Sequence, residues 1–341
     1  MGRVMCRYYI SFLAMIFVTV VGAFAGISAA EESPTSPVFR IAVVFPGSRA
    51  DFSWSQSMFD SLESVQEHMG GTKALSLTFS ENMTDPLEIE DALRFYASSG
   101  CDLVIAHGLQ YGEILEKIAM GFPLTSFAWG SSSPEEHHIS RNVFMYHVAS
   151  EQVGYLNGTI AALLTETGTV GIIGTLESEE SKQYVAGFQE GAKAVSSNVA
   201  VMVSYTDSFD DFALARDAAK VLIGMDVDVL TGLSQQTMGV MEIVKESGVF
   251  WLGMQADQKS LASEYVVASQ LYDWEKTIVS MIDCRKNGIF GGKHFMLTLR
   301  NGGLKMNFND ELQSSFFIKD TADHIVQAII EETIKPMSSI T

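Results

Sequence analysis

The feature that most constrains the fold is an alternation of short apolar segments with amphipathic helical patterns, which runs through the chain twice. The apolar segments are residues 39–45, 74–79, 103–106 and 124–129 in the first series, and 170–173, 200–205, 227–230 and 250–254 in the second. The helical patterns cover 53–69, 150–165, 180–195, 211–223 and 235–246, with others after Asp85 and around Leu115. Strands this apolar, separated by helices, indicate parallel sheets covered on both faces. The sequence therefore predicts an α/β protein with two doubly wound parallel-sheet lobes.

The two series also predict the domain boundaries. We expect an N-terminal lobe over residues 38–148 and a C-terminal lobe over 149–270. An apolar segment at 265–269 and a helix at 273–286 have no series of their own, so part of 271–341 should return to the first lobe. A length of 341 residues agrees with two domains of ordinary size. Ligands of open α/β folds bind at the carboxyl ends of the strands, so the predicted binding site is a cleft between the lobes, joined by a hinge.

The N-terminus carries the pattern of an export signal. Arg3 and Arg7 precede an uncharged apolar stretch over residues 8–30 that ends in Ser28-Ala29-Ala30. Small residues at this point predict a signal peptide of residues 1–30, cleaved after Ala30, followed by a linker over 31–37 and a periplasmic or secreted location. The alternative is an uncleaved anchor, because a stretch of this length could span a bilayer. Cys6 lies before the apolar stretch, so no cysteine stands where bacterial lipid attachment requires one.

Charge and cysteine content exclude some classes of function. The chain has 22 Lys and Arg against 41 Asp and Glu, and the resulting net charge of −19 repels phosphate backbones, which argues against nucleic-acid binding. After signal cleavage two cysteines remain, Cys101 and Cys284. We favour two buried free thiols over a disulfide, since an oxidising compartment permits a bridge without requiring one.

Signatures of enzymes, cofactors and metals are weak. Gly168, Gly171 and Gly174 have a spacing reminiscent of dinucleotide sites, but the middle glycine lies inside an apolar strand rather than in a phosphate-binding turn. The adjacent His137 and His138 follow a polar loop, and a solvated loop is a better interpretation than a metal site. We therefore predict no catalysis, no cofactor and no metal.

Several short motifs resemble one family over nearly the whole mature chain. They are Ala50-Asp51-Phe52-Ser53-Trp54-Ser55-Gln56-Ser57, Ser80-Glu81-Asn82, residues 102–108, residues 154–158, residues 167–171 with 187–191, Ser208-Phe209-Asp210-Asp211 and Ala256-Asp257-Gln258. Their order and spacing are similar to those of the basic membrane protein family of ABC transporter solute-binding proteins, which are purine and purine-nucleoside receptors. The resemblance implies a periplasmic-binding-protein fold that delivers its ligand to ABC transporter permease subunits.

The departures from the family pattern concern the ligand. Nucleoside receptors of this family usually carry charged residues at four places that correspond here to Phe45-Pro46, Trp129-Gly130, Gln255 and Gln270. Carboxylates that could grip a ribose are thus missing or replaced by amides. The tryptophan in the first motif resembles a branch that binds free purine bases such as adenine, so the resemblance implies a base rather than a nucleoside.

The candidate site residues follow from the chemistry of a purine, which is flat and has hydrogen-bonding groups along its edges. The expected ligand-binding residues, taken from the ends of predicted strands and from the motifs, are Phe52, Trp54, Gln56, Glu81, Asn82, His107, Gln110, Trp129, Glu177, Gln235, Gln255 and Asp257. Structural roles remain open for some of them. Trp54 could be a core residue, His107 a loop histidine with satisfied hydrogen bonds, and Phe209 a contact that fixes the start of a helix.

The leading hypothesis is a monomeric extracytoplasmic receptor that closes around a purine, most plausibly a free base, and delivers it to a permease. A nucleoside or another small aromatic solute is the alternative within binding proteins. A ligand-sensing subunit for a signalling partner is the alternative of another class. An enzyme such as a nucleoside hydrolase would need an aspartate cluster near the first strand, which the chain lacks.

Overall fold

The computed structural model describes residues 37–130 and 140–337. The expected leader with its cleavage site and the His137-His138 pair lie outside the described residues. From Pro37 onward the chain forms one compact unit. Within the described ranges we find no helix with the length and apolar character needed to cross a membrane.

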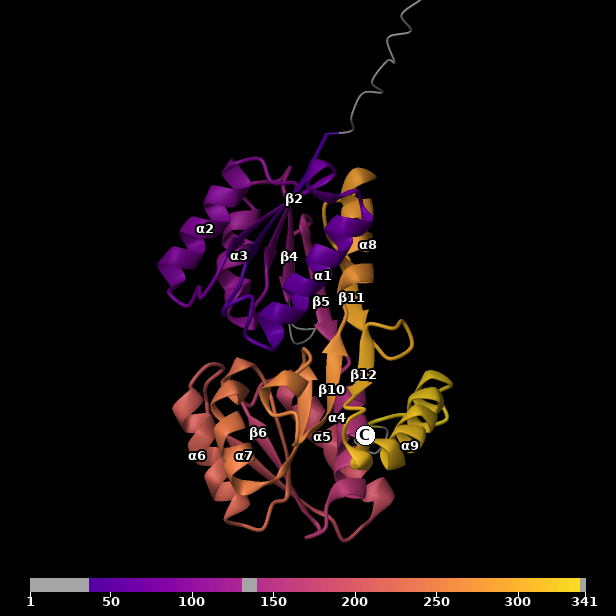
Figure 1. Cartoon of the computed structure of the whole chain (residues 1–341). Coiled ribbons are helices and arrows are strands. Elements are labelled where there is room, and N and C mark those ends of the chain that lie inside the picture. Colours follow the sequence, from indigo (N-terminus) through magenta and orange to yellow (C-terminus); the bar gives the residue numbers. More distant parts are fainter. Residues whose placement is uncertain (1–36, 131–139, 338–341) are drawn as a thin grey trace, which may run out of the picture. The chain divides into compact units, whose positions relative to one another are not determined.

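The first sheet has six strands in the order β11-β5-β4-β3-β1-β2, and all neighbours are parallel. The strands are β1 (Phe39–Val44), β2 (Leu75–Ser80), β3 (Leu103–Ala106), β4 (Ser126–Gly130), β5 (Val143–Val148) and β11 (His294–Leu297). Helices α1 (Trp54–His68) and α8 (Glu275–Lys286) pack on one face of this sheet, and α2 (Pro86–Ser98) and α3 (Gly112–Ala119) pack on the other (Figure 1).

The second sheet also has six strands, in the order β12-β10-β9-β8-β6-β7. These are β6 (Thr169–Gly174), β7 (Ala200–Tyr205), β8 (Val229–Gly232), β9 (Phe250–Gln255), β10 (Val266–Tyr272) and β12 (Leu304–Phe308), with β12 antiparallel to β10. Its helices are α4 (Ser150–Leu164), α5 (Glu179–Val195) and α9 (Gln313–Ile330) on one face, and α6 (Phe212–Ile223) and α7 (Met241–Ser247) on the other. Two doubly wound lobes confirm the predicted fold class.

Local sequence signals explain where the helices begin. The Asp85 carboxylate accepts hydrogen bonds from the backbone N–H groups of Leu87 and Glu88, and Pro86 occupies the first helical position of α2. Asp211 caps α6 in the same way. At the start of α1, the buried Asp51 carboxylate accepts from the backbone N–H groups of Ser53, Ser55 and Gln56. Each helix therefore starts directly after the loop that follows a strand.

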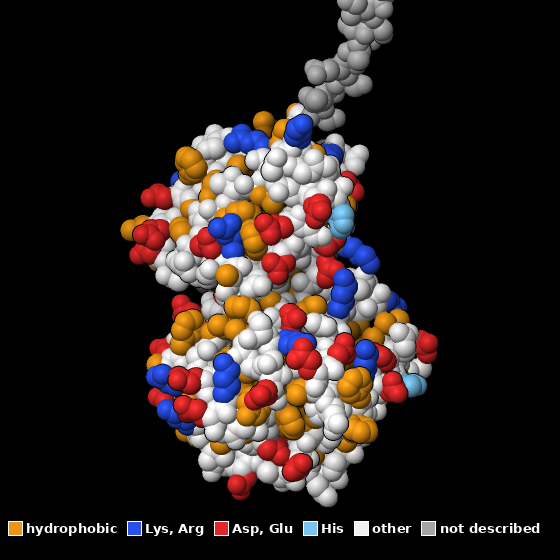
Figure 2. Space-filling model, in the orientation of Figure 1, with side chains coloured by type: hydrophobic (Ala, Val, Ile, Leu, Met, Phe, Trp, Pro, Cys, Tyr) orange, Lys and Arg blue, Asp and Glu red, His pale blue; other side chains and the backbone are white. Residues whose placement is uncertain are grey.

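The chain passes between the lobes three times. β5 in the first sheet leads into α4 on the second, β10 leads back into α8, and β11 leads into β12. On the face drawn in Figure 2, acidic and basic side chains are interspersed over both lobes, and the surface is hollowed where the lobes meet.

The structure also contains elements that the sequence patterns did not indicate. β5, β11 and β12 are absent from the predicted strands, although β5 is a six-residue, almost fully buried strand and β12 alternates apolar and polar residues; β11 has four residues, of which only Leu297 is buried. The expected helix over 235–246 is divided into a 3₁₀ turn, Gln235–Gly239, and α7. Cys101 and Cys284 are both buried and free, and they belong to different hydrophobic clusters.

Candidate functional site

A cavity of about 750 Å³, counted with the space open to solvent at its mouth, lies between the two lobes. This volume falls within the roughly 300 to 1,000 Å³ typical of small-molecule sites. The first lobe contributes residues from the loops after β1, β3 and β4, and the second contributes residues from the loops after β6, β7, β8 and β9 and from the starts of α4 and α5. The lining residues are Pro46, Trp54, Gly108, Leu109, Gln110, Gly130, Ser150, Thr175, Ser178, Glu180, Ser181, Tyr184, Phe209, Leu233, Ser234, Gln235, Met254, Gln255 and Tyr272.

One wall of the cavity is aromatic. The Trp54 indole is stacked on the His107 imidazole, with ring centroids 4.3 Å apart and an angle of 7° between the planes. Trp274 and Tyr272 contact the indole edge-on, with centroid distances of 5.5 and 6.3 Å. Because His107 covers one face of the indole, a ligand ring can stack only on the opposite face.

His107 supports this wall rather than lining the cavity. Its side chain is fully buried, and its Nε2 lies 3.0 Å from the Trp54 carbonyl oxygen, which can only accept a hydrogen bond. Nε2 therefore carries the proton, and Nδ1 accepts from the Tyr146 hydroxyl at 2.7 Å. Burial lowers the pKa of His107 to about 3, so the ring is neutral at physiological pH. The satisfied histidine, one of the two roles left open by the sequence, is the role that the structure shows.

The second lobe supplies the only charged group among the lining residues of this described cavity, the carboxyl of Glu180 in the first turn of α5. Burial raises its pKa to about 7 and the neighbouring Ser150 hydroxyl opposes part of this shift. A helix N-terminus favours a carboxylate by about 0.3 to 1 kcal/mol, whereas a shift from 4.5 to about 7 corresponds to about 3 kcal/mol. Burial therefore dominates, and near pH 7 the carboxyl is divided between its neutral and ionised forms.

Ser150 lies at the first position of α4 and is 2% exposed. Although its hydroxyl is close enough to Glu180 to affect that pKa, its geometry gives Oγ no hydrogen-bond partner within the described part of the chain. A buried hydroxyl without a partner is costly, by about 1 to 3 kcal/mol. This group is thus free to bond something that enters the cavity.

Amides and hydroxyls complete the polar lining. Gln110, Gln235 and Gln255 line the cavity from three different loops. The Gln235 Oε1 accepts from the Ser234 hydroxyl at 2.6 Å. The Gln255 Oε1 accepts from the Ser53 hydroxyl of the other lobe, and Gln258 donates to the Phe52 carbonyl oxygen at 2.9 Å. These last two contacts tie the lobes together beside the cavity.

Of the twelve residues expected from the sequence, Trp54, Gln110, Gln235 and Gln255 line this cavity. The other eight lie elsewhere. Phe52 and Gln56 bond one another at the interlobe contact, Glu81 pairs with Arg49, and His107 and Trp129 are buried. Asn82, Glu177 and Asp257 are exposed, and Asp257 accepts a hydrogen bond from Asn307. Trp129 is buried because its indole packs against Gly112 and donates to the Gly108 carbonyl oxygen.

Four further residues line the cavity without any sequence pattern that marks them as ligand-binding: Glu180, Ser150, Tyr184 and Tyr272. Ser150 begins α4, Glu180 and Tyr184 lie on α5, and Tyr272 ends β10. These elements border the cavity only because the two lobes pack together. Gln270, at one of the four places where the resemblance expects a charged residue, is fully buried on β10. Its amide atoms have no partner among the described residues, and it does not line the cavity.

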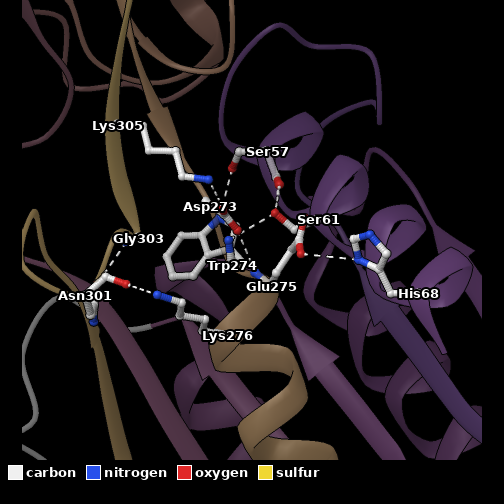
Figure 3. Close-up of polar contacts among 10 residues, drawn as sticks. All are labelled: Ser57, Ser61, His68, Asp273, Trp274, Glu275, Lys276, Asn301, Gly303 and Lys305. Atoms are coloured by element: carbon white, nitrogen blue, oxygen red, sulfur yellow. Dashed lines mark hydrogen bonds and ion pairs between the residues drawn. The ribbon is translucent and has the colours of Figure 1, made fainter.

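The crossing segment between β10 and α8 is fixed beside the aromatic wall (Figure 3). The backbone N–H of Trp274 donates to Ser61 Oγ and its indole N–H donates to Ser57 Oγ, both at 3.0 Å, so the segment is held against α1. On its other side Asp273 pairs with Lys305 of β12. Two of the crossing segments are therefore connected to each other and to the helix that carries Trp54.

Comparison with known proteins agrees with this geometry. A family model described as ABC transporter substrate-binding protein, PnrA-like, matches residues 38–338. The chain belongs to this PnrA-like family. The match confirms the resemblance that the motifs indicated. The family is one of substrate-binding proteins rather than a class of enzymes.

Individual relatives of this PnrA-like protein are distant but cover most of its length. A purine-binding protein of Brucella abortus is 23% identical over 292 residues, which are 86% of this chain and 80% of the relative. An ABC transporter nucleoside-binding protein of Lactococcus lactis is 24% identical over 306 residues, covering 83% and 84% of the two chains. Among solved structures, an ABC transporter solute-binding protein of Aeropyrum pernix superposes with a TM-score of 0.73 at 21% identity, covering 87% of this chain and 92% of that one.

Proposed function

We propose that this PnrA-like protein is the extracytoplasmic receptor of an ABC importer and that it binds a free purine base in the cavity between its lobes. The observation that carries the proposal is the combination of a flat indole face, offered by Trp54, with hydrogen-bonding groups around it and no basic side chain among the lining residues. A purine base is flat, neutral and rich in edge donors and acceptors, so it complements such a site.

The choice of a base over a nucleoside rests on the polar lining. A ribose is held best by charged groups, because charge-assisted hydrogen bonds are roughly twice as strong as neutral ones. Apart from Glu180, every polar lining residue is an amide, a hydroxyl or backbone. Names of relatives support purine compounds in general, since one is a purine-binding and another a nucleoside-binding protein.

Location and partners follow from the family. A substrate-binding protein of an ABC transporter meets its permease outside the cytoplasm, which agrees with the export signal expected from residues 1–30. Ligand exchange requires that the lobes separate, so we expect rotation about the three crossing segments and breakage of the Ser53–Gln255 and Gln258–Phe52 hydrogen bonds. We propose that the protein acts as a monomer.

Calorimetric titration of the mature protein with adenine and with adenosine tests the proposal. The base is expected to bind at least as tightly as its nucleoside. Gln235→Ala, at the cavity, is expected to weaken binding by about tenfold, as loss of one or two hydrogen bonds does. Gln183→Ala, which removes a half-buried glutamine of α5 that does not line the cavity, is the matched control and should bind as the wild type does. A hundredfold preference for the nucleoside would contradict the choice of a base, and absence of binding to either compound would refute a purine receptor.

A further inference from the structure

We infer that Glu180, with Ser150 beside it, is the group that reads the hydrogen-bonding edge of the ligand, and that it does so as a neutral carboxylic acid. This inference rests on the proposed function. It specifies that the ligand bound in the same cavity is a purine base with a hydrogen-bond donor next to a hydrogen-bond acceptor on one edge. The rest of the cavity offers no comparable group, because the other lining residues of the described chain are uncharged.

The surroundings of Glu180 favour the neutral acid when the cavity closes. The titratable groups of α5, β10 and the first turn of α4 that are not exposed include Tyr184, Tyr272 and Glu151, none of which is a cation at neutral pH, whereas the cations of α5, Lys182 and Lys193, are exposed. Burial raises the pKa of Tyr184 to about 12 and raises that of Tyr272 well above its ordinary value, so both phenols stay neutral. Burial also raises the pKa of Glu151. A flat neutral ligand that covers Glu180 removes more water without adding a positive charge, so it disfavours the ionised form further.

A neutral carboxylic acid presents one O–H donor and one C=O acceptor side by side. Adenine presents an amino N–H donor next to a ring-nitrogen acceptor, so two parallel hydrogen bonds can form. An ionised carboxylate has only acceptors and fits instead two adjacent N–H donors, such as those of the 2-amino-6-oxopurine edge. The unpartnered Ser150 Oγ, which is 2% exposed and lines the same end of the cavity, is available for a further bond to the base.

Two consequences can be measured. Binding of adenine should weaken as pH rises, because only the protonated fraction of Glu180 binds; between about pH 5.5 and about pH 8.5 the affinity should fall by about thirtyfold for a group that titrates near 7. Adenine itself stays neutral over this range. Binding at about pH 7 should also take up about half a proton, which calorimetry in buffers of different ionisation enthalpy detects.

The decisive variant is Glu180→Gln, because an amide keeps one donor and one acceptor at every pH. Its Kd for adenine should no longer change with pH and no proton should be taken up. Glu180→Ala should weaken binding by about ten- to a hundredfold at about pH 5.5, as expected when two hydrogen bonds are lost, and its deficit relative to the wild type should shrink at about pH 8.5, where most of the wild-type Glu180 is ionised. Glu151→Gln and the exposed Glu179→Gln are matched controls, and both should retain the pH dependence of the wild type.

The outcomes separate this inference from the function on which it rests. Adenine binding with a flat pH profile, or with release of a proton, overturns the inference while the purine receptor stands. A pH dependence that survives in Glu180→Gln or disappears in Glu151→Gln overturns it as well. If no purine binds at any pH, the proposed function fails and this inference with it. Should Glu180→Gln not fold, proton uptake by the wild type still decides.

Discussion

The indole N–H of Trp54 donates to the carbonyl oxygen of His107 at 3.0 Å, and the Nε2–H of His107 donates to the carbonyl oxygen of Trp54 at the same distance. With the two rings stacked, this reciprocal pair fixes the indole at the start of α1 and aligns it with the end of β3. The rigid pair makes one face of Trp54 structural and leaves the other for a ligand.

This arrangement predicts a mixed effect of Trp54→Ala. Stacking of a ring on a base contributes about 1 to 3 kcal/mol, so adenine binding should weaken by about ten- to a hundredfold. Because Trp54 is only half-buried, the ligand-free protein should lose about 1 to 3 kcal/mol of stability, less than the roughly 3 to 5 kcal/mol for a buried tryptophan. Calorimetry and thermal melting of the same variant measure both effects.

Trp54→Phe should keep most of the affinity, and Phe95→Ala, which removes an exposed ring of α2, is the control that should change neither binding nor melting. Unchanged affinity of Trp54→Ala would remove Trp54 from the site.

Close packing of α4 on α5 predicts a strong effect at Gly158. A Cβ atom added there would lie 2.0 Å from the Phe188 carbonyl oxygen, which belongs to the backbone of α5 and cannot move freely. Gly158→Ala should therefore lower the free energy of unfolding by about 3 kcal/mol or more, despite the better helix propensity of alanine. Gly121→Ala, whose nearest contact is 3.4 Å, should cost little. Equal denaturant midpoints for the two variants would contradict the observed helix packing.

The raised pKa of Glu180 predicts a pH-dependent stability difference between the wild type and Glu180→Gln. The pKa in the folded state, about 7, lies above the ordinary value of 4.5, so the folded protein binds more protons than the unfolded chain between these values. Wild-type stability should therefore fall as pH rises from about 4.5 to about 7, by on the order of 1 to 3 kcal/mol. The glutamine variant lacks this loss, so it should melt higher than the wild type at about pH 8, with the gap closing near pH 4.5. If the difference in melting temperature between Glu180→Gln and the wild type widened as pH falls, the pKa of Glu180 in the folded protein would be lowered instead of raised.

The two cysteines predict a simple thiol count. Cys101 and Cys284 are free, so the mature chain unfolded without reductant should react with two equivalents of a thiol reagent. The folded protein should react slowly, because both thiols are buried and burial raises the pKa of Cys101. A count of zero after unfolding would reveal a disulfide.

The apolar leader predicts the cellular location. Protein expressed with residues 1–30 should be recovered from the periplasmic or secreted fraction, shortened by about thirty residues, as for a cleaved signal peptide. Intact-mass measurement of that fraction gives the cleavage site. Recovery of only the full-length chain in membranes would favour the uncleaved anchor.

Much of the fold could be predicted because its central strands are continuous apolar runs between helices with clear caps. Val43 and Val44 face opposite hydrophobic clusters of the first lobe, which is why the strand that carries them is apolar on both sides. β11 and β12 lack this signal, since edge strands are only partly buried and one is held by antiparallel pairing with β10.

For the candidate site, the strand pattern is enough to predict which loops meet. Gln110, Gln235 and Gln255 follow strands of parallel sheets, and the carboxyl ends of such strands come to one edge whatever the side chains are. Trp54 follows β1 for the same reason. Two of the motifs that resemble the family, residues 50–57 and 256–258, follow β1 and β9 at this edge, so the family too could be recognised from sequence.

Packing between distant segments sets which side chains turn toward the cavity and how they are charged. His107 and Trp129 lie at the carboxyl ends of strands just as Gln255 does, yet they turn inward, because Tyr146 and Gly112 offer them partners there. Glu180 reaches the cavity from the start of α5, where burial beside Ser150 changes its protonation. Periodicity along a chain records which positions are apolar, but the burial and pKa of a polar group depend on neighbours brought from distant segments.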